Sequence, residues 1–271
     1  MTLAPKPITS LQNARVKAIR ALEMRKVRKE TGLFVAEGAS LLVSAREHGF
    51  VPESLVYRAG SADSGVARGL VAWALQSGAE CLEVSEAVLG KLASKDNPQS
   101  MLAAFRQRWG EAPTGTEAAR EDVWLALEEV RDPGNLGTII RTADAVGAKG
   151  VILVGQSCDP YSRECVRATM GSIFAVQLVG MSREAFLEWR GGWAGDVVGT
   201  HLGAGDDFRT VAYRTPALLL MGSEGPGLSE PLAKACTRLV KIPMAGRLDS
   251  LNLAVATALM LYQIRGPHLQ L

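Results

Sequence analysis

Short apolar runs alternate with helical patterns along most of this 271-residue chain. From residue 122 onward the apolar runs are nearly continuous, which is typical of parallel strands covered on both faces. We therefore predict an α/β fold, with a parallel sheet between two layers of helices. The predicted strands cover residues 123–130, 150–154, 174–179, 196–200, 217–221 and 239–242, and the predicted helices 136–146, 164–172 and 250–264.

The first part of the chain carries a second, shorter alternation. Its predicted strands cover residues 33–36, 54–57 and 81–84, and its predicted helices 40–48 and 66–76. Residues 106–121 have no apolar periodicity and contain both Gly and Pro, as linkers do. This pattern predicts a smaller domain over 1–105, a linker over 106–121 and a second domain over 122–271.

Charge is distributed unevenly along the chain. The whole protein has a formal net charge of +2, yet its first forty residues hold eight Lys or Arg against three Glu. We predict one amphipathic helix there, with Ser10 as N-cap and Gly32 as C-cap. A solvated helix face is one interpretation of this charge, and contact with nucleic-acid phosphates is the other. Its local clustering favours the second. The candidate RNA-binding cations are Arg15, Lys17, Arg25, Lys26, Arg28 and Lys29.

Several classes of protein are disfavoured by composition. No run of 18 apolar residues occurs and the N-terminus has no leader-like segment, so we expect a cytoplasmic protein without a membrane span. The four cysteines are scattered and lack nearby histidines, so we expect no metal site. None of the three histidines lies in a recognisable catalytic motif, which disfavours chemistry by a histidine base.

The first motif with chemical potential follows the strand predicted over 123–130. Asn135 is a candidate N-cap, and Arg141 lies six residues further along the predicted helix. Arg and Asn near a helix N-terminus are suited to meet a phosphate or a ribose. Alternatively, Asn135 only caps the helix and Arg141 pairs with Asp144 or Glu128.

The second motif is the loop Gly222-Ser-Glu-Gly-Pro-Gly227, at the end of an apolar strand. Its glycines allow the backbone to approach a ligand, and ligands of open α/β sheets bind at the carboxyl ends of strands. The loop matches neither the dinucleotide nor the P-loop pattern. The alternative is a tight turn with an exposed Glu224.

The third motif runs from Ile242 to Asn252 and opens a long helix. Asp249 or Ser250 is the expected cap, which leaves the Asn252 side chain available to a partner outside the helix. Residues 253–264 are apolar on nearly every face, which favours burial against a partner subunit over burial inside one subunit.

Taken in order, the motifs N-x-G-x-x-x-R-x-A, G-x-E-G-x-G and I-P-M-x-G-x-x-x-S-L-N-x-A resemble those of the SpoU/TrmH class of RNA ribose 2'-O-methyltransferases, in the SPOUT superfamily. The resemblance covers residues 122–266. The first hundred residues are similar to the N-terminal substrate-binding domain of that class, through residues 10–17, 34–38 and 97–99. Ser100 stands where the family usually has Gly.

The resemblance implies a C-terminal α/β domain with a deep trefoil knot and an N-terminal α/β domain like ribosomal protein L30e. It also implies a homodimer formed through the C-terminal domain, and S-adenosylmethionine as cofactor. The residues expected to hold the cofactor are Thr200, Leu220, Gly222, Ile242, Met244 and Leu251. The side chains expected at the reacting centre are Asn135, Arg141, Glu224, Ser250 and Asn252.

The implied reaction is methyl transfer to a ribose 2'-hydroxyl, with large-subunit (23S) rRNA favoured over tRNA because a separate N-terminal domain is present. Such transfer depends on alignment and needs neither a metal nor a covalent nucleophile. A guanidinium is a poor base at neutral pH, so we assign Arg141 to orienting the phosphate and hydroxyl and leave proton abstraction open. The alternatives are a tRNA methyltransferase and a non-catalytic RNA-binding or ribosome-assembly protein.

Overall fold

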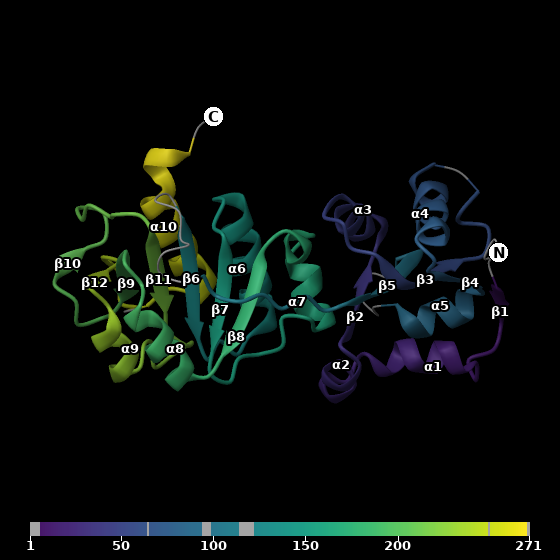
Figure 1. The fold of residues 1–271 in the computed structure, drawn as a ribbon, viewed down its shortest axis with the longest axis horizontal. Helices are drawn as coiled ribbons and strands as arrows, with labels where there is room; N and C mark the ends of the chain where they lie inside the picture. The colour runs from purple at the N-terminus through teal and green to yellow at the C-terminus, as the bar shows by residue number, and fades with distance from the viewer. Residues whose placement is uncertain (1–5, 64, 94–98, 114–121, 249, 270–271) are drawn as a thin grey trace. The chain divides into compact units, whose positions relative to one another are not determined.

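The computed structural model describes residues 6–63, 65–93, 99–113, 122–248 and 250–269. Residues 114–121 of the predicted linker, residues 97 and 98 of the third N-terminal motif and the cap candidate Asp249 lie outside the described residues. Two compact units make up the chain (Figure 1). Unit 1 comprises Met1–Gln107 with Asp159–Phe174, and unit 2 comprises Arg108–Cys158 with Ala175–Leu271.

Unit 1 is built on a mixed five-stranded sheet in the order β1-β4-β3-β5-β2. Strand β5 runs antiparallel to both of its neighbours, whereas β1, β3 and β4 are parallel. Its strands are β1 (Lys6–Ile8), β2 (Leu33–Glu37), β3 (Pro52–Arg58), β4 (Glu80–Val84) and β5 (Met101–Arg106). Its helices are α1 (Ala14–Ala21), α2 (Arg25–Thr31), α3 (Ala39–Glu47), α4 (Gly65–Gln76), α5 (Glu86–Leu92), α7 (Arg163–Ala168) and the 3-10 turn η1 (Ser172–Phe174).

Two apolar layers cover the sheet of unit 1. One face packs against α1 and α5, through residues such as Ile19 and Leu89. On the sheet's aromatic side, Phe34 of β2 and Phe105 of β5 lie against Tyr161 and Phe174, with centroids 4.7 Å apart for Phe34–Tyr161 and 5.4 Å for Phe105–Phe174. Residues 159–174, which lie between two strands of the second half, therefore belong to the core of unit 1.

The single basic helix predicted for the N-terminal segment is wrong, because the segment forms two helices. Asn13, not Ser10, is the N-cap of α1, since its side chain accepts the Arg15 N–H. The chain turns at residues 22–24, where the Arg28 guanidinium donates to the carbonyls of Leu22 and Glu23 at 2.7 and 2.8 Å. Gly32 ends α2 in the left-handed region with φ +67°, as predicted.

Unit 2 contains a seven-stranded sheet in the order β10-β12-β9-β11-β6-β7-β8, and every pairing is parallel, as predicted. Its strands are β6 (Val123–Glu128), β7 (Gly150–Val154), β8 (Gln177–Met181), β9 (Asp196–Thr200), β10 (Asp206–Asp207), β11 (Ala217–Met221) and β12 (Arg238–Lys241). Its helices are α6 (Pro133–Ala145), α8 (Arg183–Gly191), α9 (Glu230–Ala235), α10 (Leu253–Arg265) and the 3-10 turn η2 (Gly266–His268).

Helices cover both faces of this sheet (Figure 1). Residues such as Trp124 and Leu220 point towards α8 and α9, which contribute Phe186 and Leu232 to one core cluster. Helices α6 and α10 pack on each other and on β7 and β11. The middle strands are therefore buried throughout, which explains their uninterrupted apolar sequence. Within the described residues, no helix has the length and hydropathy needed to cross a membrane.

Candidate active site

A cavity of about 420 Å³ opens at the carboxyl ends of β9, β11 and β12. Ligands of open parallel sheets bind at this edge, because the loops that leave neighbouring strands converge there. The walls combine apolar side chains with backbone from four loops. The lining residues are Thr200–Leu202, Met221–Leu228, Val240–Ile242, Met244, Ser250–Leu253 and Ala256.

The loop after β11 is folded so tightly that its first residue must be glycine. A Cβ on Gly222 would lie 1.9 Å from the carbonyl carbon of Gly227. The loop closes on itself through hydrogen bonds between Ser223 and Gly227, with Gly225 and Gly227 at φ +94° and +73°. Backbone instead of side chains therefore forms this wall of the cavity, as the sequence predicted for a ligand-binding loop.

One hydrogen-bonded cluster joins the three motifs. The Asn135 side chain donates from Nδ2 to Glu224 Oε1 at 3.1 Å and accepts at Oδ1 from Asn252 Nδ2 at 2.9 Å. Glu224 also accepts the backbone N–H groups of Arg131 and Asp132 at 3.1 and 3.4 Å. A residue from α6, one from the loop after β11 and one from the start of α10 are thus held together.

The Glu224 carboxylate is stabilised in its charged form. Burial raises its pKa, but the hydrogen bonds that Asn135 and the backbone of Arg131 and Asp132 donate outweigh it. The net pKa of Glu224 lies below its ordinary value. Glu224 is therefore a carboxylate near neutral pH, suited to accepting hydrogen bonds and to facing positive charge.

A second carboxylate, which the sequence interpretation missed as a functional residue, anchors the far end of the same loop. Glu128 is only 4% exposed and accepts from Ser229 N at 2.8 Å and Ser229 Oγ at 2.6 Å. Arg183 donates to it at 2.9 Å and to neighbouring Glu129 at 3.0 Å. The available signal was an acidic residue at the last position of an apolar strand, because a charge buried there requires partners.

Eight of the eleven predicted site residues line the cavity: Thr200, Gly222, Glu224, Ile242, Met244, Ser250, Leu251 and Asn252. Leu220 does not line it, because its side chain is fully buried in the core beneath α8 and α9. Asn135 reaches the lining through its bonds to Glu224 and Asn252. Arg141 lies exposed on α6 outside the cavity wall.

Two helix caps differ from the prediction. Asp132, not Asn135, caps α6, since its side chain accepts the Asn135 N–H at 2.6 Å. Asn252, not Ser250, caps α10, because its Oδ1 accepts the N–H groups of Ala254 and Val255. The Asn135 amide is thereby released from capping, and Asn252 caps with its oxygen while its nitrogen reaches Asn135.

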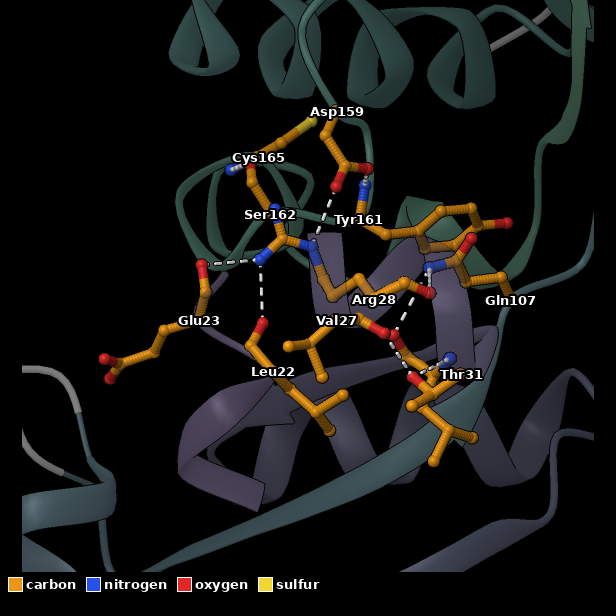
Figure 2. Close-up of polar contacts among 11 residues, drawn as sticks. Leu22, Glu23, Val27, Arg28, Thr31, Gln107, Asp159, Tyr161, Ser162 and Cys165 are labelled. Carbon is orange, nitrogen blue, oxygen red and sulfur yellow. Dashed lines mark hydrogen bonds and ion pairs between the residues drawn. The ribbon is translucent and has the colours of Figure 1, made fainter. Parts of the chain in front are cut away.

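Five of the six predicted RNA-binding cations are exposed on α1 and α2: Arg15, Lys17, Arg25, Lys26 and Lys29. Arg28 is a correction. Its side chain is 5% exposed and paired with Asp159, with Nε 2.8 Å from Oδ2 (Figure 2). It also donates to two backbone carbonyls, so it is not available to a phosphate at the surface.

The donor set of the cavity indicates which ligands it suits. Apolar side chains such as Leu228 and Met244 alternate with backbone edges and the carboxylate of Glu224. That combination suits an organic molecule with flat apolar and polar parts, and the volume lies within the usual range for such sites. No group of three or more His, Cys, Asp or Glu placed to hold a metal ion occurs among the described residues.

Comparison with known proteins identifies the family. Residues 122–262 match the SpoU rRNA Methylase family, and residues 13–103 match the MRM3-like substrate binding domain. The chain therefore belongs to the SpoU rRNA methylase family, as its motifs predicted. The predicted enzyme class, an RNA methyltransferase, is thereby confirmed.

Full-length relatives are similar over nearly the whole chain. The protein is 29% identical to the 23S rRNA (guanosine(2553)-2'-O)-methyltransferase RlmP of Bacillus subtilis, over 96% of this chain and 100% of the relative. It is 31% identical to the 23S rRNA (uridine(2479)-2'-O)-methyltransferase of Streptomyces viridochromogenes, over 97% and 92%. An AdoMet-bound rRNA methyltransferase from Sinorhizobium meliloti has a similar structure, with a TM-score of 0.90 and 44% identity over 98% of this chain and 99% of that one. The predicted fold class, a SPOUT-type α/β domain with a smaller N-terminal α/β domain, is confirmed.

Proposed function

We propose that this protein transfers a methyl group from S-adenosylmethionine to a ribose 2'-hydroxyl of RNA, with large-subunit rRNA as substrate. The observation that carries the proposal is the cluster of Asn135, Glu224 and Asn252 at the rim of the cavity. The three residues come from the three motifs of the family, and each contacts another of the set. The AdoMet-bound relative and the two 23S rRNA 2'-O-methyltransferases support the cofactor and the substrate.

The cavity provides for the cofactor mainly with backbone. Residues around Gly222, Ile242, Met244 and Leu251 would hold it, with Thr200 at the end of β9. Leu220 contributes to this site only through its backbone, because its side chain is in the core. When bound, S-adenosylmethionine supplies an electrophilic methyl group on a positively charged sulfur. Apolar walls exclude water, and the ionised Glu224 lies on the rim as a counter-charge.

The remaining side chains orient the ribose. Arg141 would hold the substrate phosphate and direct the hydroxyl, since a guanidinium remains charged and donates in a fixed plane. Asn135 and Asn252 fix the position of Glu224, and Ser250 supplies a hydroxyl at the same rim. Alignment of this kind contributes most of the rate in a reaction that needs no covalent intermediate.

Unit 1 would bind the RNA. Its match to a substrate-binding domain and the exposed cations of α1 and α2 support this role. We propose domain boundaries near residues 105 and 122, with residues 159–174 added to the RNA-binding part. The cytoplasmic location expected from the sequence stays a prediction.

A second copy of the chain would cover an apolar stripe on α10. Val255, Leu259 and Tyr262 are 49%, 40% and 51% exposed, and they follow one another at helical spacing. Their spacing gives a continuous apolar face on a helix that is otherwise buried. The stripe borders Asn135 and Asn252, so a homodimer formed here would adjoin the active site.

The proposal is tested by cofactor binding and by methyl transfer in one set of assays. Calorimetry should detect S-adenosylmethionine and S-adenosylhomocysteine binding that EDTA leaves unchanged. Labelled methyl should then appear on 2'-oxygens of transcribed 23S rRNA, located by nucleoside digestion, with a tRNA pool as the comparison. Binding that disappears with EDTA, or a label found only in tRNA or only on bases, would contradict the proposal.

A further inference from the structure

Arg28 is buried in a place where a cation serves no surface function. Its guanidinium donates to Asp159 Oδ2 and to the carbonyls of Leu22 and Glu23, all within 2.8 Å (Figure 2). Asp159 is itself mostly buried, and its other oxygen accepts the Tyr161 N–H at 2.9 Å. Each partner is therefore held in one geometry by further hydrogen bonds, unlike a surface ion pair.

The same residue also anchors a second point of the chain. The Arg28 carbonyl accepts from Gln107 Nε2 at 3.2 Å, and Gln107 donates to Leu33 O as well (Figure 2). Gln107 is the last residue of unit 1 before the chain continues into unit 2, and Asp159 is the first residue after it returns. The chain passes between the units at three places, and two of them are fixed to Arg28.

On its other side, the residue next to Asp159 is tied to the loop of the active site. Cys158 belongs to unit 2 and donates its N–H to Val130 O at 2.7 Å. Val130 lies two positions before Asp132, the cap of α6, and the backbone N–H groups of Arg131 and Asp132 donate to Glu224. A short run of fixed contacts thus leads from Arg28 to the cluster of Asn135 and Glu224.

We propose that Arg28 and Asp159 form a positioning pair for methyl transfer. The pair fixes the chain between the RNA-binding unit and the loop 129–132, so that RNA bound by unit 1 is presented to an active site of defined geometry. This inference rests on the proposed function. It assigns to Arg28 a role in the alignment of bound RNA, in place of contact with a phosphate.

Directional contacts can be separated from stability at this site. Replacing a buried ion pair by apolar residues of similar size is often neutral or stabilising, because the desolvation of two charges is avoided. The double variant R28M/D159L should therefore keep the fold while it removes the directional bonds. Displacement of a bound substrate by about 1 Å is enough to slow transfer by about 10²-fold.

The experiment measures single-turnover methyl transfer at saturating rRNA, per site that binds S-adenosylhomocysteine. R28M/D159L should transfer at least about tenfold more slowly than the wild type, with cofactor and RNA affinities and the melting temperature essentially unchanged. Q107L should show a smaller decrease, and it decides the matter alone if the double variant does not fold. The matched control is R106M/E53L, which makes the same kind of replacement in an exposed ion pair of unit 1.

Wild-type transfer rates in folded R28M/D159L, or in Q107L if only that variant folds, would overturn the positioning role. Loss of cofactor affinity in parallel with the rate would also overturn it, because the pair would then act on the folding of unit 2. A wild-type protein that methylates no RNA would instead contradict the proposed function itself, and the wild-type arm of the assay separates that failure from the other two.

Discussion

Asn252 Nδ2 donates to Asn135 Oδ1 at 2.9 Å, although 117 positions separate the two residues in the chain. The contact is possible because Asn252 caps α10 with its oxygen and Asn135 lies in the first turn of α6 with its own side chain free of capping. Since Asn135 Nδ2 also donates to Glu224, the Asn135 amide orients one residue of each other motif. The geometry of the rim therefore depends on this one amide.

Asn135→Ala should impair transfer more than cofactor binding. The substitution leaves Glu224 Oε1 and Asn252 Nδ2 without this partner, and a misplaced rim slows an alignment-dependent reaction by about 10²-fold. Radiolabel transfer and calorimetry measure the two effects separately. Thr138→Ala, one turn along α6, removes only a bond to the helix's own Gly134 carbonyl and serves as control. An equal loss in both variants would contradict the role of Asn135.

Arg141→Ala should abolish most transfer while cofactor affinity survives. Arg141 lies outside the cavity wall, so its contribution is expected only when RNA is present. Arg141→Lys should restore little, because a lysine lacks the planar fork that binds a phosphate in two places. Kinetics with saturating cofactor test this. Loss of S-adenosylhomocysteine binding in Arg141→Ala would show that the residue serves the cofactor instead.

Replacing Arg25, Lys26 and Lys29 together by Ala should weaken RNA binding and reduce its dependence on salt. The slope of log affinity against log salt should fall by about 0.7 to 0.9 for each phosphate that the protein no longer neutralises. Filter binding over a range of salt concentrations measures it. Lys234→Ala removes an exposed cation of unit 2 that pairs with Glu230, and it should leave the slope unchanged. A wild-type slope in the triple variant would make α2 a solvated face.

Glu224→Gln should reduce stability at neutral pH and make little difference in acid. The folded pKa of Glu224 lies below its ordinary value, so the unfolded state binds more protons between the two pKa values. Its contribution is fully present above the unfolded pKa of about 4.3 and is lost as the pH falls through the folded pKa. Melting temperatures of both proteins at pH 7 and at about pH 3 to 4 test the sign. A gap that widens in acid would contradict it.

Leu259→Glu should convert a dimer into monomers or unfold the protein. A charge at this position would be buried against the second copy without a partner, which is strongly unfavourable. Light scattering should give about twice 28.9 kDa for the wild type. Val66→Glu, at an exposed position on α4 of unit 1, should leave the mass unchanged. A native wild-type monomer that methylates RNA would refute the dimer.

Much of the fold could be predicted, because strand and helix periodicity is local. The strands β7, β9 and β11 have the predicted bounds, and the parallel sheet follows from their unbroken apolar sequence. The prediction omitted α8 and α9, which form part of the layer over Trp124 and Leu220. The predictions for residues 114–121 and for Asp249 fall outside the described residues.

The site was predictable to the extent that it consists of glycine loops and short motifs. Gly222 is required by a backbone that returns within 1.9 Å of its Cβ position, and such a requirement is written into the local sequence. Which polar side chain caps a helix was less predictable. Asp132 and Asn135 are both good cap residues three positions apart, and the choice depended on Glu224 being present to occupy the Asn135 amide.

The sequence by itself determined the periodicity of the elements, the glycine turns and the order of the three motifs, because each depends on residues close together in the chain. Only the tertiary structure decided the fate of Arg28. Its charge and position match those of its exposed neighbours, but its environment is set by Asp159, 131 positions away. Burial depends on which distant segment packs against a residue, and neither charge nor helical period contains that information.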